Sequence, residues 1–332
     1  MKRKEVKREE KRKKKILIAI LAILFTGIIL SASTYAWFTA NRTVRVDTIN
    51  INAVASNGIQ ISTDAVNWKP VVNSTDIANA TNNYSAAVNK LPADLNPVST
   101  IGEIDSTTGY IKMFLGTVEP SGTSYALTAS REIESSSTSY DDANANFVVF
   151  DLFFKISTSA PVYLSPDSQV TVHTGSTDKG LQNAARVAFV NEGNVPVGQA
   201  ETNAQSKKDG SGIIIWEPNY TTHNQSGVDN AKNTYGKTSF TSSSSDDPYY
   251  GVKADISTPV ALTSTDSNLF GSVNPTIKTP TGNTSYNNFF TLSAGVTKVR
   301  VYMWVEGQDV DCENNASGAS FDVVMSFSLD NE

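Results

Sequence analysis

The residues of this chain that are best suited to chemistry are the carboxylates of an acidic segment near its end, 306–314. Asp309, Asp311 and Glu313 alternate there, so an extended or looped backbone directs their oxygens to the same side. Hard cations such as Ca²⁺ bind clusters of carboxylate oxygens of this kind. The spacing differs from that of an EF-hand loop, because Asn314 stands where that loop has Gly. The segment is interpreted either as a calcium site or as a solvated turn between two strands.

Support for catalysis is weak. The two histidines, His173 and His223, lack the spacing of a zinc site, and the many serines form no Gly-x-Ser-x-Gly turn. Cys312 is the only cysteine and has no evident histidine partner. We therefore predict that the protein is not an enzyme, and we interpret both histidines as solvated.

Several aromatic residues have side chains that stack well on sugar rings, namely Trp216, Trp304 and the pair Tyr249-Tyr250. Trp304 shares a strand face with Arg300 and Tyr302, and we expect that face to be partly exposed. The alternative is that the tryptophans pack between sheets, which is the more frequent fate of a strand Trp.

The elements that position these residues are strands, because apolar residues recur with period two. Phe147–Ser157 is apolar on one face and mostly apolar on the other, which predicts a central strand covered on both sides. Ala319–Leu329 alternates, with Phe321, Val323, Met325, Phe327 and Leu329 on the inward face. Val44–Ala53 changes parity near Thr48, which predicts a β-bulge or a twist there. Shorter strands are expected at 58–62, 109–116, 124–129, 162–164, 169–173, 186–191, 212–216, 287–292 and 296–305.

These strands are separated by Gly, Asn, Ser and Pro, and no long helix is expected among them. The pattern predicts an all-β fold, an antiparallel β-sandwich. Three polar segments with little periodicity, 73–105, 132–145 and 218–250, are interpreted as long insertions, either binding loops or featureless surface loops.

The beginning of the chain has the form of an export segment. Residues 1–15 form a basic cytoplasmic region, and the apolar run Ile16–Leu30 follows it at once. Its 15 residues lie at the upper limit of a signal peptide and fall short of the roughly 18–20 that a spanning helix needs. Residues 16–36 are therefore either a cleaved signal peptide or a retained membrane anchor, and 37–332 form an extracellular domain.

Charge and cysteine content fit an exported protein. The basic region carries a net charge of +7, so 16–332 carries −13 of the total of −6. An acidic exported part disfavours nucleic acid and anionic lipid as partners. A single cysteine permits no intrachain disulfide, so stability must come from core size, metal ions or assembly.

The segment Ser33–Thr39, Ser-Thr-Tyr-Ala-Trp-Phe-Thr, follows the apolar run directly. It resembles the export signal of TasA-type and camelysin-type proteins, which are Gram-positive surface and biofilm-matrix proteins. The resemblance implies cleavage between Ala36 and Trp37 by a dedicated signal peptidase. It also implies a jelly-roll-like β-sandwich and fibres in which the N-terminal segment of one subunit adds a strand to the next.

On this chain the donor strand would be 37–53, with Val44, Val46, Ile49 and Ile51 filling a neighbour's groove. The resemblance is confined to the signal region and the general strand pattern. The chain departs from the family in its long polar insertions and in its acidic segment, and no metal-ligand motif supports the peptidase activity attributed to camelysin.

Three functions follow from the sequence. The leading hypothesis is a non-enzymatic, secreted or cell-surface structural protein that assembles with itself into a matrix or fibre. The second is a membrane-anchored adhesin or carbohydrate-binding module, with Ca²⁺ bound by the acidic segment. The third is a camelysin-like peptidase. The first hypothesis requires no cofactor. Its partners are the membrane and a signal peptidase, at least during export.

Overall fold

The computed structural model describes residues 44–53, 58–92, 94–121, 124–132, 146–235, 241–243, 250–261, 264, 266–273, 276–313 and 316–330. The predicted basic region, the segment 16–36 and the cleavage site at Ala36 and Trp37 lie outside these residues. In the described part of the chain, no helix combines the length and the apolar character needed to cross a membrane.

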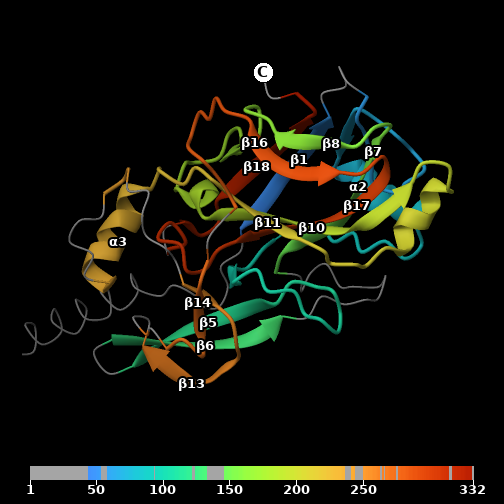
Figure 1. The fold of residues 1–332 in the computed structure, drawn as a ribbon. Coiled ribbons are helices and arrows are strands. Elements are labelled where there is room, and N and C mark those ends of the chain that lie inside the picture. Colours follow the sequence, from blue (N-terminus) through green and yellow to red (C-terminus); the bar gives the residue numbers. More distant parts are fainter. Residues whose placement is uncertain are drawn as a thin grey trace, which may run out of the picture.

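Strands dominate the described residues, so the prediction of an all-β fold is confirmed (Figure 1). The first sheet has the order β16-β8-β18-β1-β3, and β9 also pairs with β18. Its strands are β16 (Asn287–Leu292), β8 (Ala160–Leu164), β18 (Ser320–Ser328), β1 (Arg45–Ala53), β3 (Val71–Asn73) and β9 (Gln169–Val172).

The second sheet has the order β15-β11-β10-β17-β7-β2. Its strands are β15 (Ile277–Thr279), β11 (Ile213–Pro218), β10 (Ala185–Pro196), β17 (Gly295–Val305), β7 (Val148–Ile156) and β2 (Gln60–Ser62).

A third, smaller sheet lies below the other two in Figure 1 and has the order β13-β6-β5-β4. Its strands are β13 (Ile256–Ala261), β6 (Ser124–Glu132), β5 (Met113–Ser121) and β4 (Val98–Ser99), and a separate pair joins β12 (Tyr250–Val252) to β14 (Phe270–Ser272). The hairpin predicted from 109–129 is confirmed as β5 and β6.

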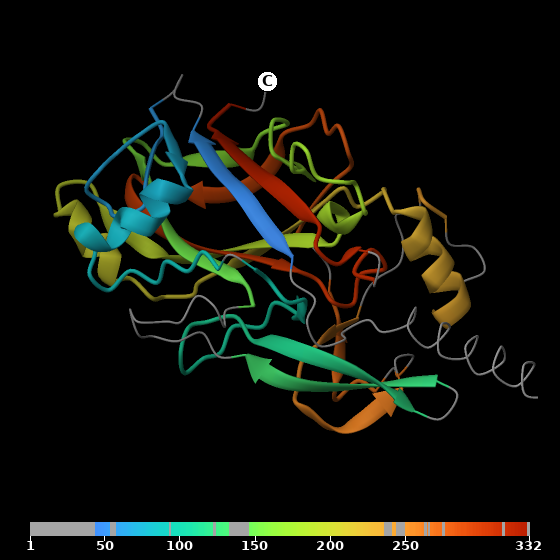
Figure 2. The same cartoon turned by 180° about the vertical axis from the view of Figure 1, so that it is seen from behind.

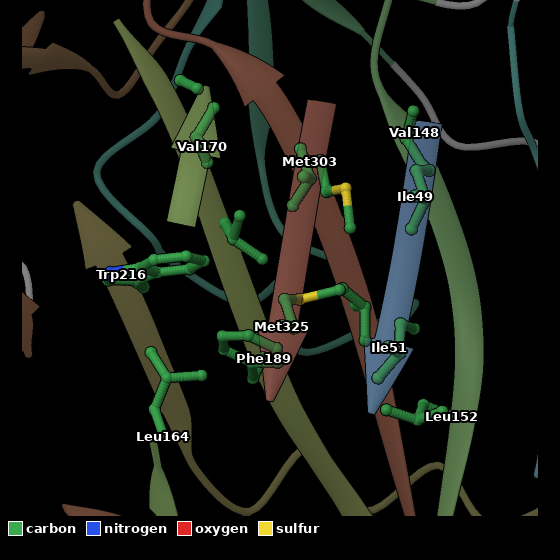
Figure 3. Close-up of a cluster of buried hydrophobic side chains, with 14 of the residues drawn as sticks. Ile49, Ile51, Val148, Leu152, Leu164, Val170, Phe189, Trp216, Met303 and Met325 are labelled. Carbon is green, nitrogen blue, oxygen red and sulfur yellow. The ribbon is translucent and has the colours of Figure 1, made fainter. Parts of the chain in front are cut away.

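The first and second sheets pack face to face around the main core. Apolar side chains from both sheets meet there, and Figure 3 shows Ile49, Ile51 and Met325 of the first sheet facing Leu152 and Phe189 of the second. An aromatic cluster contributes four rings from four strands. Phe327 lies 5.0 Å from Phe154 and 4.8 Å from Phe289, and Phe189 lies 4.9 Å from Phe289, measured between ring centroids.

The other face of the second sheet is also buried, which confirms the prediction that β7 is covered on both sides. Val149, Tyr302 and Trp304 pack there with residues that precede and form the small sheet. The expectation that the face of Trp304 is partly exposed is therefore wrong, because this extra layer of chain covers it.

The strand pairing is antiparallel for most neighbours but not for all. β1 and β18 run parallel and side by side (Figure 2), and β11 and β15 are also parallel. The expectation of a purely antiparallel sandwich is wrong at these two places. The predicted bulge in β1 is confirmed, because its register with β18 shifts between Val46 and Thr48.

Two helices lie in segments that the sequence pattern assigns to loops. Helix α2 (Ser74–Asn79) begins with a capping box, in which the Asn73 side chain accepts hydrogen bonds from the Thr75 and Asp76 amides. Helix α3 (Gln225–Tyr235) follows the segment after β11. Within the described residues, short 3₁₀ helices lie at η2 (Ala80–Asn82), η4 (Leu181–Asn183) and η5 (Glu201–Ser206).

We predict that Phe327→Ala lowers the free energy of unfolding by about 3–5 kcal/mol, because it removes the ring shared by both sheets and leaves a cavity. Urea unfolding followed by tryptophan fluorescence measures this loss. Val197→Ala is the matched control, since Val197 is exposed and its truncation changes stability by less than about 0.5 kcal/mol. A loss below about 1 kcal/mol for Phe327→Ala contradicts the role of the aromatic cluster.

Candidate functional site

The acidic segment lies between β17 and β18 and folds back against the protein. Glu306, Asp309, Asp311 and Glu313 are all buried. The interpretation of this segment as a solvated turn is therefore wrong. Burying carboxylates requires nearby donors or positive charge, and the surrounding elements supply both.

Asp309 forms a buried ion pair with an arginine of the second sheet. Arg186, near the start of β10, donates to Asp309 Oδ2 at 2.6 Å and to Glu217 Oε1 of β11 at 2.7 Å. Its other terminal nitrogen donates to the carbonyl oxygens of Asn183 and Ala185, both at 2.9 Å. This guanidinium therefore offsets the charge of Asp309.

Asp311 is held by the segment that leads into helix α3. His223 Nδ1 lies 2.7 Å from Asp311 Oδ2, and the Asn224 amide donates to Oδ1 at 2.7 Å. Burial raises the pKa of Asp311 to about 6. Helix α3 can lie close to the acidic segment because Gly227 has no side chain. A Cβ at this position would lie 2.7 Å from the Val310 carbonyl oxygen.

Glu306 is a fully buried carboxyl of the segment. The Trp304 indole donates to its Oε2 at 3.0 Å, and the Gln308 amide donates to its Oε1 at 3.1 Å. Burial is the largest influence on this group and raises its pKa to about 7, against the effect of these hydrogen bonds.

The structure brings two of the three predicted metal ligands together. Ligand atoms of Asp309, Asp311 and His223 lie within 4.8 Å of one another. Glu313 is not in this group, and its Oε1 accepts a hydrogen bond from the Ser226 hydroxyl at 2.7 Å. A nitrogen ligand with two carboxylates suits Zn²⁺ better than Ca²⁺, which takes oxygen ligands. Such an ion competes with Arg186 for Asp309, so the cluster as it stands is an ion-pair network.

Of the predicted donor strand 37–53, the structure describes residues 44–53, which include β1, and 37–43 lie outside the described residues. Val44, Ile49 and Ile51 are buried and Val46 is half-buried, all against the main core. β1 pairs with β18 along its whole length, whereas it pairs with β3 only over Asn50–Asn52. In this arrangement the groove that β1 fills belongs to its own chain.

Neither tryptophan is available to stack on a sugar, because Trp216 and Trp304 are both buried. The sugar-stacking interpretation is therefore wrong for them, and the Tyr249-Tyr250 side chains lie outside the described residues. A polar groove exists instead, with a volume of about 270 Å³, between β9 and the chain after β15. Amide and hydroxyl side chains line it, among them Gln182, Asn219, Thr222, Thr281 and Asn283.

The sequence analysis missed the partners of the acidic segment. His223 lies in an unpatterned polar segment, and its side chain is 12% exposed, so interpreting it as solvated is wrong. His173 is partly exposed, and its Nδ1 lies 2.9 Å from Asp322 Oδ1. Arg186 gave a signal in the sequence, since it is a charged residue immediately before the apolar run Val187–Val190.

No family model matches this chain, and no curated protein or solved structure shows significant similarity to it.

We predict that stability falls as the pH rises from 5 to 8 and that Glu306→Gln reduces this fall. The folded-state pKa of Glu306 is about 7 against an ordinary 4.5, so the folded chain holds a proton that the unfolded chain releases over this range. We expect the fall to be on the order of 1–3 kcal/mol, measured by urea unfolding at each pH.

The exposed Glu119 provides the matched control for this measurement. Glu119→Gln leaves the pH dependence as in the parent protein. An unchanged pH dependence in Glu306→Gln contradicts the assignment.

Proposed function

We propose that this protein is a non-enzymatic structural subunit of a cell surface or extracellular matrix, and that it assembles by exchange of its first strand. The proposal includes export by the N-terminal segment, a jelly-roll-like arrangement of the two main sheets and kinship with TasA-type proteins. One observation supports it above the others. The first strand of the described chain occupies an interior position in a sheet and belongs to the main core.

The position of β1 suits exchange between subunits. It is joined to β2 of the opposite sheet only through residues 54–59, so it can leave without unthreading the rest of the chain. Its longest pairing, with β18, is parallel, and parallel ladders are slightly less stable per residue than antiparallel ones. On its outer side the pairing is short, since β3 pairs with it only over Asn50–Asn52, and Val44, just before it, forms an isolated bridge with Leu95.

β1 makes the same contacts whether it packs in its own subunit or in a neighbouring one. Burial of each Val or Ile side chain contributes about 1.5–3 kcal/mol. Val44, Ile49 and Ile51 together therefore represent a large part of the ~5–15 kcal/mol by which a domain is usually stable. A vacated groove thus strongly favours refilling, and a neighbour's β1 restores every contact. Head-to-tail exchange does not close on itself, so it propagates into a fibre.

A disulfide between β1 and β18 tests this proposal. Asn50 and Val324 are register partners, both half-buried, at a spacing that suits a disulfide. We predict that N50C/V324C, assembled and then oxidised, gives covalent multimers on a denaturing gel. The matched control T117C/T128C, on the β5–β6 hairpin, gives monomers only.

Two outcomes contradict strand exchange. The first is an assembled N50C/V324C protein that runs as a monomer after oxidation, which means that β1 stays in its own chain. The second is a protein that remains monomeric by light scattering and electron microscopy at all concentrations. The parent protein controls for Cys312, which is buried.

The polar groove supports a second candidate function, a carbohydrate-binding surface protein. Its amide and hydroxyl lining matches the hydrogen-bonding groups of a sugar. On this alternative, we predict binding to a glycan array that falls at least about tenfold in Gln182→Ala/Asn283→Ala, since two polar contacts are lost. Loss of binding in EDTA would in addition assign a cation to Asp309 and Asp311. Array binding that the groove variant leaves unchanged contradicts a role for the groove.

A further inference from the structure

A second buried charge cluster lies on the outer face of the second sheet, away from the acidic segment. It contains Asp151 of β7, Lys298 and Arg300 of β17, and Glu192 of β10, all buried. Arg300 pairs with Asp151 in the strand register, and Lys298 is two residues away on the same face. These charged groups therefore lie together in an environment from which water is excluded.

The amine of Lys298 lies against the carboxylate of Asp151. Its Nζ is 3.3 Å from Asp151 Oδ2, and both side chains are 0% exposed. The Tyr84 hydroxyl lies 2.9 Å from the same oxygen and accepts from Lys298 Nζ at 3.0 Å. Arg300 Nε donates to the other oxygen, Oδ1, at 2.9 Å. Neighbouring strands thus hold a nucleophile beside an electrophilic carbon, and Arg300 and Tyr84 donate to the two oxygens of that carboxylate.

Glu192 adds an acid that the ion pairs do not use. It occupies a bulge in β10, between the residues that pair with Arg300 and Lys298. Burial raises its pKa, and the charges of Arg300 and Lys298 and the nearby Gly210 amide oppose that shift. By hydrogen-bond geometry, neither carboxyl oxygen has a partner within the described chain. Glu192 is therefore a buried carboxyl that can give and take a proton beside Lys298.

We propose that Lys298 and Asp151 condense into an amide bond that covalently joins β17 to β7. Nζ of Lys298 attacks Cγ of Asp151, a bond forms between them, and the bond from Cγ to Oδ2 breaks. Two of the three ammonium protons leave with Oδ2 as water, one of them relayed by Glu192, and the third stays on the amide nitrogen. An ammonium and a carboxylate become an amide and water, so no oxidant, cofactor or further reactant is needed.

The surroundings favour each part of this step. Arg300 Nε, at Oδ1, stabilises the negative charge that this oxygen gains in the tetrahedral intermediate. Burial lowers the pKa of Lys298, which favours the free amine that attacks. The charges of Arg300 and Lys298 hold the pKa of Asp151 down against its burial, so the resting state is an ion pair. The amide removes two buried charges at once and leaves Glu192 as the counter-ion of Arg300.

A surface ion pair on the same strand provides an internal comparison. Lys155 Nζ of β7 lies 2.7 Å from Glu201 Oε1, closer than Lys298 lies to Asp151, but both side chains are more than a third exposed. Water stabilises those charges and competes for the carboxyl carbon. We therefore expect no amide between Lys155 and Glu201, so that burial rather than proximity decides the reaction.

Mass spectrometry of the full-length protein, denatured and then digested, tests the proposal. We expect the peptides that contain Lys298 and Asp151 to be joined and lighter than their sum by one water molecule. In Asp151→Asn the same pair loses one ammonia molecule instead, because the amide nitrogen is then the leaving group. Glu192→Gln slows joining at least about tenfold after refolding, as the loss of a positioned proton relay does. Lys155→Met leaves the rate of joining unchanged.

Separate, unmodified peptides for Lys298 and Asp151 from the folded wild-type protein overturn the proposal. Their detection needs no variant to fold and does not depend on where the N-terminus is processed. Joining at the wild-type rate in Glu192→Gln overturns the relay role. The cross-link does not depend on strand exchange, because β7 and β17 belong to the sheet that β1 does not enter.

Discussion

The fold depends on the burial of both faces of its second sheet. β17 is buried at every position, and β7 at all but one. One face packs on the first sheet, and the other is covered by segments that no regular sandwich requires. Most polar side chains on that covered face find a partner inside the protein, since an unpaired buried charge costs several kcal/mol, and Glu192 is an exception by hydrogen-bond geometry. The two charge clusters of this protein are consequences of this constraint.

The acidic segment shows how the constraint is met. Arg186 and Trp304 lie on the covered face of β10 and β17, and each needs an acceptor. Asp309 and Glu306 provide them by folding back over the end of the sheet. The alternation of carboxylates, which suggests a cation site in the sequence, thus also serves to accept hydrogen bonds from the sheet. Helix α3 closes the arrangement through His223, which reaches Asp311.

The sequence predicts strands well and partners poorly. The two-sided apolar pattern of Phe147–Ser157 identifies a central strand, and the change of parity near Thr48 identifies the bulge in β1, because both signals are local. The pairing of β1 with β18 joins opposite ends of the chain and leaves no local trace. Likewise, Asp151 and Arg300 are charged residues in mostly apolar strands. Each signals a buried ion pair, but the sequence does not say with which residue.

The two main sheets differ in their dependence on the first strand. The first sheet loses an interior strand if β1 leaves, and β18 then presents an open edge above an apolar groove. The second sheet does not include β1, and it keeps its outer layer and its buried ion pairs. A subunit built in this way can give up one strand while the opposite sheet maintains the shape of the groove. Strand exchange needs this combination, since a groove that collapsed on losing β1 could not receive a neighbour's strand.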